Sequence, residues 1–359
     1  MVTAGGLRAR LFARPERAVR GLSLGWAMAA GVFVVAASLL GLALGPVDLG
    51  IAAVAREVLS HVPFLGVESS FSDTQDAILW ELRAPRVALG LLVGAMLAAA
   101  GASYQGVFRN PLADPYLLGA AAGVGLGATI VIANDLGGDA GVDLRPVAAF
   151  AGAMLGVGIA YALGSSVGGR QTATLILAGV TVASFLTALQ TYVQQRSADS
   201  VQEVYSWILG RLETSGWTDV LIVLPYVGVS AVVLLWHRRL LDVLSVGDDE
   251  AASLGVPVAR VRLLVVAAAT LGTAAAVAFS GLIAFVGIIV PHAVRLMAGT
   301  SYRVVLPLSL AFGAGFLVLM DLVSRTVVAP AQLPIGVVTA FLGAPFFAVV
   351  LRTTRTVGP

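Results

Sequence analysis

About ten long apolar runs follow one another along this chain, and they decide what it can fold into. A helix needs roughly 20 mostly apolar residues to cross a bilayer, and the first run extends from about Leu22 to Leu44. Further runs centre near residues 93, 123, 155, 182, 228, 269, 289, 313 and 342. The 359 residues leave room for these helices and short connections, but not for a sizeable soluble domain. We therefore predict an all-α, polytopic membrane protein with about ten transmembrane helices.

The distribution of arginine predicts the topology. The chain has 22 Lys and Arg residues, and all of them are arginine. With the N-terminus in the cytoplasm, the cytoplasmic segments hold fifteen arginines and six acids, and the outer segments hold seven arginines and fourteen acids. Since cytoplasmic loops carry the excess of positive charge, we expect both termini in the cytoplasm and the chain in the inner (plasma) membrane. Two halves of five spans would then be inverted relative to each other, because five is odd.

The predicted domain organisation has one large unit. Residues 1–20 form a cytoplasmic N-terminal segment whose five arginines precede an uncleaved first span, which is too long for a signal-peptide core. Residues 21–352 form a single transmembrane domain, and residues 353–359 form a cytoplasmic tail. The connection 237–260 is the long cytoplasmic loop of this domain.

Several residue types are missing, and their absence excludes classes of chemistry. Without lysine the chain has no Walker A loop and no Schiff-base nucleophile, so if ATP powers it, another chain binds ATP and Mg. Without cysteine it has no disulfide or thiolate metal site. There is no HExxH motif, and we predict no metal site and no catalytic residue, which disfavours an intramembrane hydrolase. The net charge of +2 reflects arginines at span ends, so we expect contact with membrane lipid and not with nucleic acid.

Three stretches stand out from the apolar background. "RNPLADP", residues 109–115, should form a rigid cytoplasmic turn, because its prolines forbid a continuous helix and Asn and Asp can bond the freed backbone groups. In residues 240–262, three acids from Asp248 should open a short exposed helix that Gly255 closes. That helix could dock a partner or be a solvated loop. Prolines also interrupt residues 281–299 and 321–347, where His292 could be a ligand, a proton carrier or a structural hydrogen-bonding group.

Together these stretches resemble the FecCD-type permeases, which are subunits of ABC importers for iron–siderophore complexes, heme and vitamin B12. The resemblance covers about residues 80–352 and rests on "LRAPR", "RNPLADP", "LLGAAAG", "LILAGV", "LGV", "FVGIIVPHAVRL" and "LPIGVVTAFLGAPFF" in that order. It implies three partners: a cytoplasmic ABC ATPase, an extracytoplasmic solute-binding protein, and a second permease, either an identical copy or a similar chain. It also implies alternating access, with ATP hydrolysis on the ATPase and no enzymatic activity or bound cofactor in this chain.

The resemblance also assigns roles to individual residues. The ATPase contact would fall on Asp248, Asp249, Glu250, Ala251, Leu254, Gly255 and Val256. Binding-protein docking would fall on Arg83, Arg86 and Arg325. Pairing of these arginines with Glu81 or Asp321, or interfacial anchoring, is the alternative. The cytoplasmic gate would comprise Asn110, Leu112, Thr172 and Ala173. The path would be lined by small and hydroxyl residues and a few glutamines such as Gln105 and Gln190.

The expected cargo follows from the family resemblance alone. We expect an iron chelate, either a siderophore complex or heme, with vitamin B12 as the alternative within the family. An ion-coupled secondary transporter is the alternative of another class. It would need an ionisable group inside the bilayer, and Asp321 is the only near-span candidate.

Overall fold

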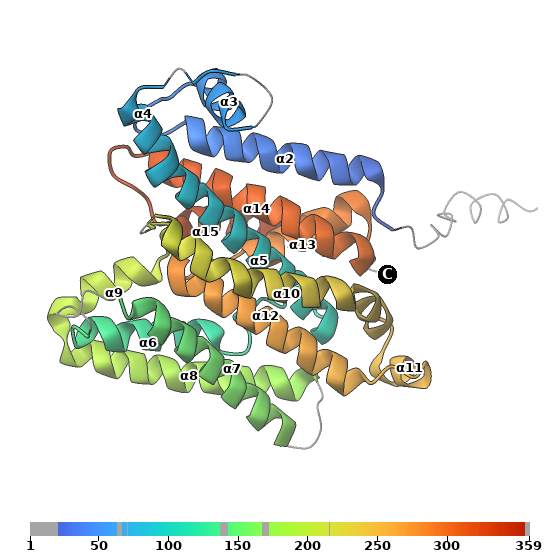
Figure 1. The fold of residues 1–359 in the computed structure, drawn as a ribbon. Helices are drawn as coiled ribbons and strands as arrows, with labels where there is room; N and C mark the ends of the chain where they lie inside the picture. Colours follow the sequence, from blue (N-terminus) through green and yellow to red (C-terminus); the bar gives the residue numbers. More distant parts are fainter. Residues whose placement is uncertain are drawn as a thin grey trace, which may run out of the picture.

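The computed structural model describes residues 21–62, 67–69, 71–136, 143–166, 172–214 and 216–355, and every regular element in these ranges is helical (Figure 1). The predicted N-terminal segment 1–20, the side chain of Thr172 and the end of the predicted tail lie outside the described residues. The all-α prediction is confirmed for the part of the chain that is described.

Ten described helices coincide with the ten predicted apolar runs. Seven are long and apolar enough to cross a membrane: α2 (Leu24–Ala43), α5 (Ala84–Phe108) with the residues before it, α7 (Arg145–Ser166), α8 (Thr172–Arg196), α10 (Trp217–Leu244), α12 (Val258–Ser280) and α14 (Tyr302–Thr326). Three apolar helices are shorter: α6 (Ala120–Ala133), α13 (Val286–Ala298) and the apolar part of α15 (Ile335–Arg355), which ends at Val350. Membrane-spanning length is therefore found for seven of the ten, and the inverted relation of the halves stays a prediction.

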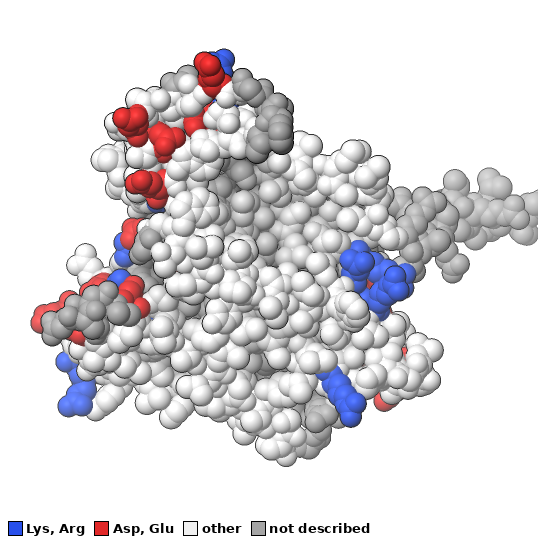
Figure 2. Space-filling model, viewed as in Figure 1, with Lys and Arg blue, Asp and Glu red and all other residues white. Residues whose placement is uncertain are grey.

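The remaining elements are short and lie at the two ends of the bundle. We call the end that carries α3 (Ile51–Ser60), α4 (Asp73–Ala77) and α9 (Val201–Ile208) the outer end, and the end that carries α11 (Asp248–Ser253) the inner end (Figure 1). A single 3₁₀ turn, η3 (Ala198–Ser200), precedes α9. Figure 2 shows acidic side chains gathered over the outer end and a group of arginines at the opposite end, near α11. This charge separation agrees with the predicted topology.

Helices α5, α12 and α14 form the core of the bundle. About three-quarters of the apolar window around α5 is buried (78%), against 22% for that of α2, and α5 packs against α10, α12, α13 and α14. Small residues permit this, because glycine lets helix backbones approach closely. A Cβ atom on Gly101 would lie only 2.0 Å from the Gly287 carbonyl oxygen on α13. The crossing of α5 and α13 therefore requires glycine at this position.

A π-helical stretch, η1 (Ile78–Arg83), joins α4 to α5. Pro85 explains it: proline has no N–H to donate to the carbonyl of Glu81, and its ring would clash with that carbonyl in a regular helix. The wider turn changes the direction of the side chains just before the proline, and Arg83 is only 6% exposed. The local sequence thus places an arginine inside the outer end of the bundle.

Candidate functional site

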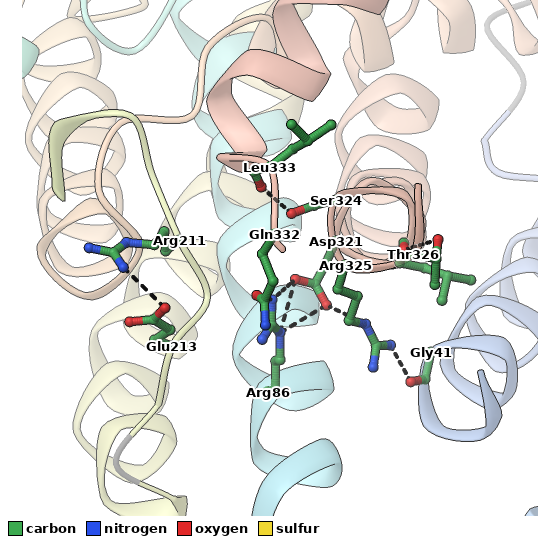
Figure 3. A network of polar contacts seen from close by, with 11 residues as sticks. Gly41, Arg86, Arg211, Glu213, Asp321, Ser324, Arg325, Thr326, Gln332 and Leu333 are labelled. Atoms are coloured by element: carbon green, nitrogen blue, oxygen red, sulfur yellow. Dashed lines mark hydrogen bonds and ion pairs between the residues drawn. The ribbon is translucent and has the colours of Figure 1, made fainter. Parts of the chain in front are cut away.

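The first candidate site is an arginine network at the outer end (Figure 3). Arg86 donates from Nε and Nη2 to Asp321 Oδ1 at 3.0 and 2.8 Å, and from Nη2 to Gln332 Oε1 at 3.0 Å. Arg325 Nε lies 3.3 Å from Asp321 Oδ2. The Asp321 carboxylate is 1% exposed, so it serves two guanidinium groups within the protein. A buried carboxylate held in this way is a structural ion pair.

Two buried arginines, Arg325 of this network and the neighbouring Arg83, also fix the outer end of α2. Arg83 donates from Nη1 to the carbonyl oxygens of Leu42 and Ala43, at 2.8 Å each, and from Nη2 to that of Val47. Arg325 donates to the carbonyl oxygen of Gly41. The last carbonyls of a helix have no partner within the helix and carry its negative dipole end. The two guanidinium groups therefore cap α2.

These contacts change the interpretation of the predicted docking residues. Arg83, Arg86 and Arg325 lie at the same end of the bundle, and the structure shows the alternative pairing of Arg86 and Arg325 with Asp321. Arg83 and Arg325 are buried, whereas 15% of the Arg86 side chain is exposed. Direct contact of these residues with a binding protein stays a prediction.

The second candidate site is the turn of residues 109–115, which we call the proline turn. Asn110 Oδ1 accepts a hydrogen bond from Leu112 N at 2.9 Å, and Asp114 Oδ1 accepts one from Tyr116 N at 2.7 Å. Both are side-chain-to-backbone bonds of the Asx-turn type, which hold a turn without helix or sheet. The predicted rigid turn is confirmed, and 53% of Leu112 is exposed at its tip.

The proline turn is also tied to the connection between α12 and α13. The Tyr116 hydroxyl donates to the Ile283 carbonyl oxygen at 3.1 Å and accepts from the Ile283 N–H at 3.2 Å. Burial raises the pKa of Asp114 to about 6, against the opposing effect of the Tyr116 N–H bond, which lowers it. The turn therefore contains a carboxyl group that holds its proton more tightly than an ordinary aspartate does.

The predicted path residues are partly turned into the protein. Gln105 is 3% exposed, donates to the Gly287 carbonyl oxygen at 3.1 Å and accepts from Arg295 Nη1 at 2.5 Å. The prediction that Gln105 lines the path is wrong, because its amide is used between α5 and α13. Gln190 lies against Gly125 of α6.

The remaining gate prediction concerns the beginning of α8. Ala173 is exposed there, and α8 approaches the residues after the proline turn, since a Cβ atom on Gly179 would lie 2.5 Å from the Leu117 carbonyl oxygen.

His292 packs edge-on against the ring of Phe346, with centroids 5.7 Å apart. This is a packing contact, and the three predicted roles of His292 stay predictions.

The third candidate site is the short helix α11 at the inner end. Acidic residues occupy its first turn, and Gly255, with φ of +80°, ends it. Val256 N bonds to Ala251 O at 3.1 Å and Gly255 N to Ala252 O at 2.9 Å, which is the Schellman pattern of a helix C-terminus. The predicted capped helix is confirmed, with Ala251 buried beneath it and Leu254 72% exposed.

The predicted contact residues of α11 do not all point outward. Asp249 and Glu250 are exposed, but Asp248 accepts from Arg262 Nη2 at 2.8 and 3.0 Å and lies 3.5 Å from Arg109 Nη2. Arg109 and Arg262 could not be predicted as partners of Asp248, because no local spacing relates either arginine to it. Asp248 is therefore an internal contact of the inner end.

A cavity of about 760 Å³ lies between α7, α10 and α12, beside α9. Aromatic residues line it, with the ion pairs Arg145–Asp143 and Arg211–Glu213 at 2.8 and 3.2 Å. Burial alone would raise the pKa of Asp143, but hydrogen bonds from Arg145 hold this pKa below its usual value. Arg211 and Glu213 of this cavity are drawn with the arginine network in Figure 3, but they make no hydrogen bond to it there.

Comparison with known proteins gives one consistent family. The sequence profile of the FecCD transport family matches residues 33–353. The chain is 38% identical to the cobalamin import system permease protein BtuC of Halobacterium salinarum, with 92% of this chain and 96% of that protein covered. It is 36% identical to the hemin transport system permease protein HmuU of Yersinia pestis, with 85% and 90% covered.

The fold is likewise similar to that of a solved transporter. A structure described as an inward-facing conformation of a metal-chelate type ABC transporter superimposes with a TM-score of 0.78 and 28% identity. The alignment covers 91% of this chain and 98% of that chain. Sequence and fold therefore agree over nearly the whole chain.

Proposed function

Because the chain belongs to the FecCD transport family and is an ABC importer permease, we propose that it moves an iron chelate across the inner membrane by alternating access. The ATPase is a separate subunit in this family. The proposal takes the inner end of the bundle to be cytoplasmic, with α6, α13 and α15 completing ten crossings. Support comes from the charge asymmetry between the two ends (Figure 2).

One observation supports the mechanism: the proline turn and the exposed helix α11 lie side by side at the inner end, since Arg109 of the turn pairs with Asp248 of α11. The proline turn presents Leu112, and α11 presents Asp249, Glu250 and Leu254 to solvent. We infer that α11 contacts the ATPase through these residues and Val256, while the turn and the beginning of α8, at Thr172 and Ala173, form the gate. Nucleotide-driven movement at α11 would then be transmitted to the gate.

Vitamin B12 is the second candidate cargo. The similarity to a cobalamin permease at 38% identity favours it, whereas the similarity to a hemin permease and to a metal-chelate type transporter favours an iron chelate. The cargo test is uptake by the complex in proteoliposomes, with hemin, an iron–hydroxamate complex and cyanocobalamin as probes. Uptake of cyanocobalamin alone would replace the iron proposal with the cobalamin one.

The ATPase contact is tested by reversing charge on α11. The double variant Asp249→Arg, Glu250→Arg should lose co-purification with the ATPase subunit, because both acids are exposed. Asp76→Arg is the matched control, since Asp76 is an exposed acid at the outer end. Equal ATPase binding by both variants would contradict the assignment.

At the outer end, we propose that Arg86 meets acidic groups of the binding protein, and that Arg83 and Arg325 act by fixing α2. Arginine suits this role because its planar group can hold a carboxylate bidentately. Arg86→Gln should weaken docking to nanodisc-embedded transporter, and the remaining affinity should depend less on salt. Arg86→Lys keeps the charge and should retain most of the docking. Unchanged docking by Arg86→Gln would refute the assignment.

A further inference from the structure

Asp248 has two arginine partners that belong to different parts of the inner end. Arg262, in the second turn of α12, is 2% exposed and donates to both carboxylate oxygens. Arg109 Nη2 lies 3.5 Å from Asp248 Oδ1, and 40% of the Arg109 side chain and 34% of the Asp248 side chain are exposed. One contact is therefore part of the packed core, and the other is an ion pair in contact with solvent.

Arg109 belongs to the proline turn by its backbone. It ends α5 with φ of +50°, in the left-handed region that residues with a Cβ atom rarely adopt. The next residue, Asn110, begins the Asx turn that holds Leu112. Since the turn is rigid, the position of Arg109 and the position of the exposed tip are linked.

We propose that Arg109 and Asp248 form a latch, by which we mean an ion pair that makes the proline turn follow the movement of α11. The inference rests on the proposed function and adds a positioning pair to it. Arg262 holds Asp248, the first residue of α11, against α12. A shift of α11 together with the beginning of α12 therefore displaces the carboxylate that attracts Arg109. Because exposed ion pairs are weak, the latch can open and close in each transport cycle.

The test is the ratio of cargo moved to ATP hydrolysed by the reconstituted complex with its ATPase and binding protein. Arg109→Gln should lower this ratio about two- to fivefold, the range expected for one exposed ion pair, and leave the ATPase rate largely unchanged. Arg109→Lys should restore most of the ratio. The matched control is Arg303→Gln, which removes an ion pair to Asp242 of equal length, 3.5 Å, and similar exposure at the same end.

A second measurement does not require the cargo. The chain has no cysteine, so spin labels on Leu112→Cys and Ser253→Cys, both exposed positions, report the distance between the turn and α11. If the second permease is an identical copy, mixing labelled with unlabelled copies isolates the distance within one chain. The distance distribution should be narrow, should shift on ATP binding, and should broaden in Arg109→Gln but not in Arg303→Gln.

The outcomes separate the two proposals. If the original chain transports cargo, and Arg109→Gln alters neither the transport ratio nor the distance distribution, the latch is refuted and the proposed function stands. A parallel loss of ATPase rate and transport, with an unchanged ratio, would reduce the pair to a structural contact and also refute the latch. Failure of the original chain to bind an ATPase subunit would overturn both proposals.

Discussion

Replacing Gly101 by alanine should destabilise the protein out of proportion to one added methyl group. The new Cβ atom would lie 2.0 Å from the carbonyl oxygen of Gly287, whereas ordinary contact begins at 3.4 Å. Helices α5 and α13 must therefore separate by more than 1 Å. Overpacking of this kind costs about 1–3 kcal/mol, and the strained hydrogen bond from Gln105 to Gly287 contributes about 1 kcal/mol more. The higher helix propensity of alanine offsets about 1 kcal/mol of this, so the free energy of unfolding should fall by about 1–3 kcal/mol.

The assay is reversible unfolding in mixed micelles, with Gly158→Ala as the control. Gly158 is also inside a helix, but a Cβ atom there meets nothing within 4 Å, so only the propensity gain of up to about 1 kcal/mol remains. Gly101→Ala should unfold more easily than the original chain, and Gly158→Ala should not. Equal unfolding free energies for the two variants would show that α5 and α13 do not cross as closely as described.

Two further results are expected from the same unfolding assay. Asp321→Leu should lower the free energy of unfolding by about 3–5 kcal/mol, because it leaves the buried Arg325 without its carboxylate. Arg86→Gln should lower it less, since Asp321 then keeps one partner. A smaller loss for Asp321→Leu than for Arg86→Gln would contradict this. Burial raises the pKa of Asp114 from 3.8 to about 6, so this carboxyl binds its proton more tightly in the folded chain. Its stabilising contribution is complete below the unfolded pKa and is lost as the pH rises through 6, by about 1.4 kcal/mol between about pH 5 and pH 7.5. Asp114→Asn, which keeps the oxygen that accepts from Tyr116, should remove that dependence, and an identical pH profile for both chains would refute the assignment.

Much of the fold could be predicted because its signals are local. The apolar runs predicted the positions of the ten apolar helices, and the acids before Gly255 predicted the short helix α11 with its cap. The proline turn was predictable for the same reason, since Asn110 and Asp114 bond to the backbone two residues further on.

The parts that the sequence did not reveal depend on contacts between distant residues. The sequence predicts Arg83 and Arg325 in outer segments, and they share one end of the bundle. The direction of their side chains was not predictable, because the carbonyls that they bind belong to α2. Likewise, nothing in the local pattern shows that Gln105 turns toward α13 or that Asp248 turns toward Arg262. Polar side chains near span ends can reach several partners, and only packing selects among them.

The Tyr116 hydroxyl gives both polar backbone groups of Ile283 a partner, and this sets an unusual demand on the residue. Phenylalanine would match the shape of tyrosine, but it would leave the N–H and the carbonyl of Ile283 without this hydrogen-bond partner. A smaller hydroxyl side chain would not reach either group. A substitution at position 116 should therefore be tolerated only if the new side chain brings a polar oxygen to both backbone groups of Ile283, whatever its volume or hydrophobicity.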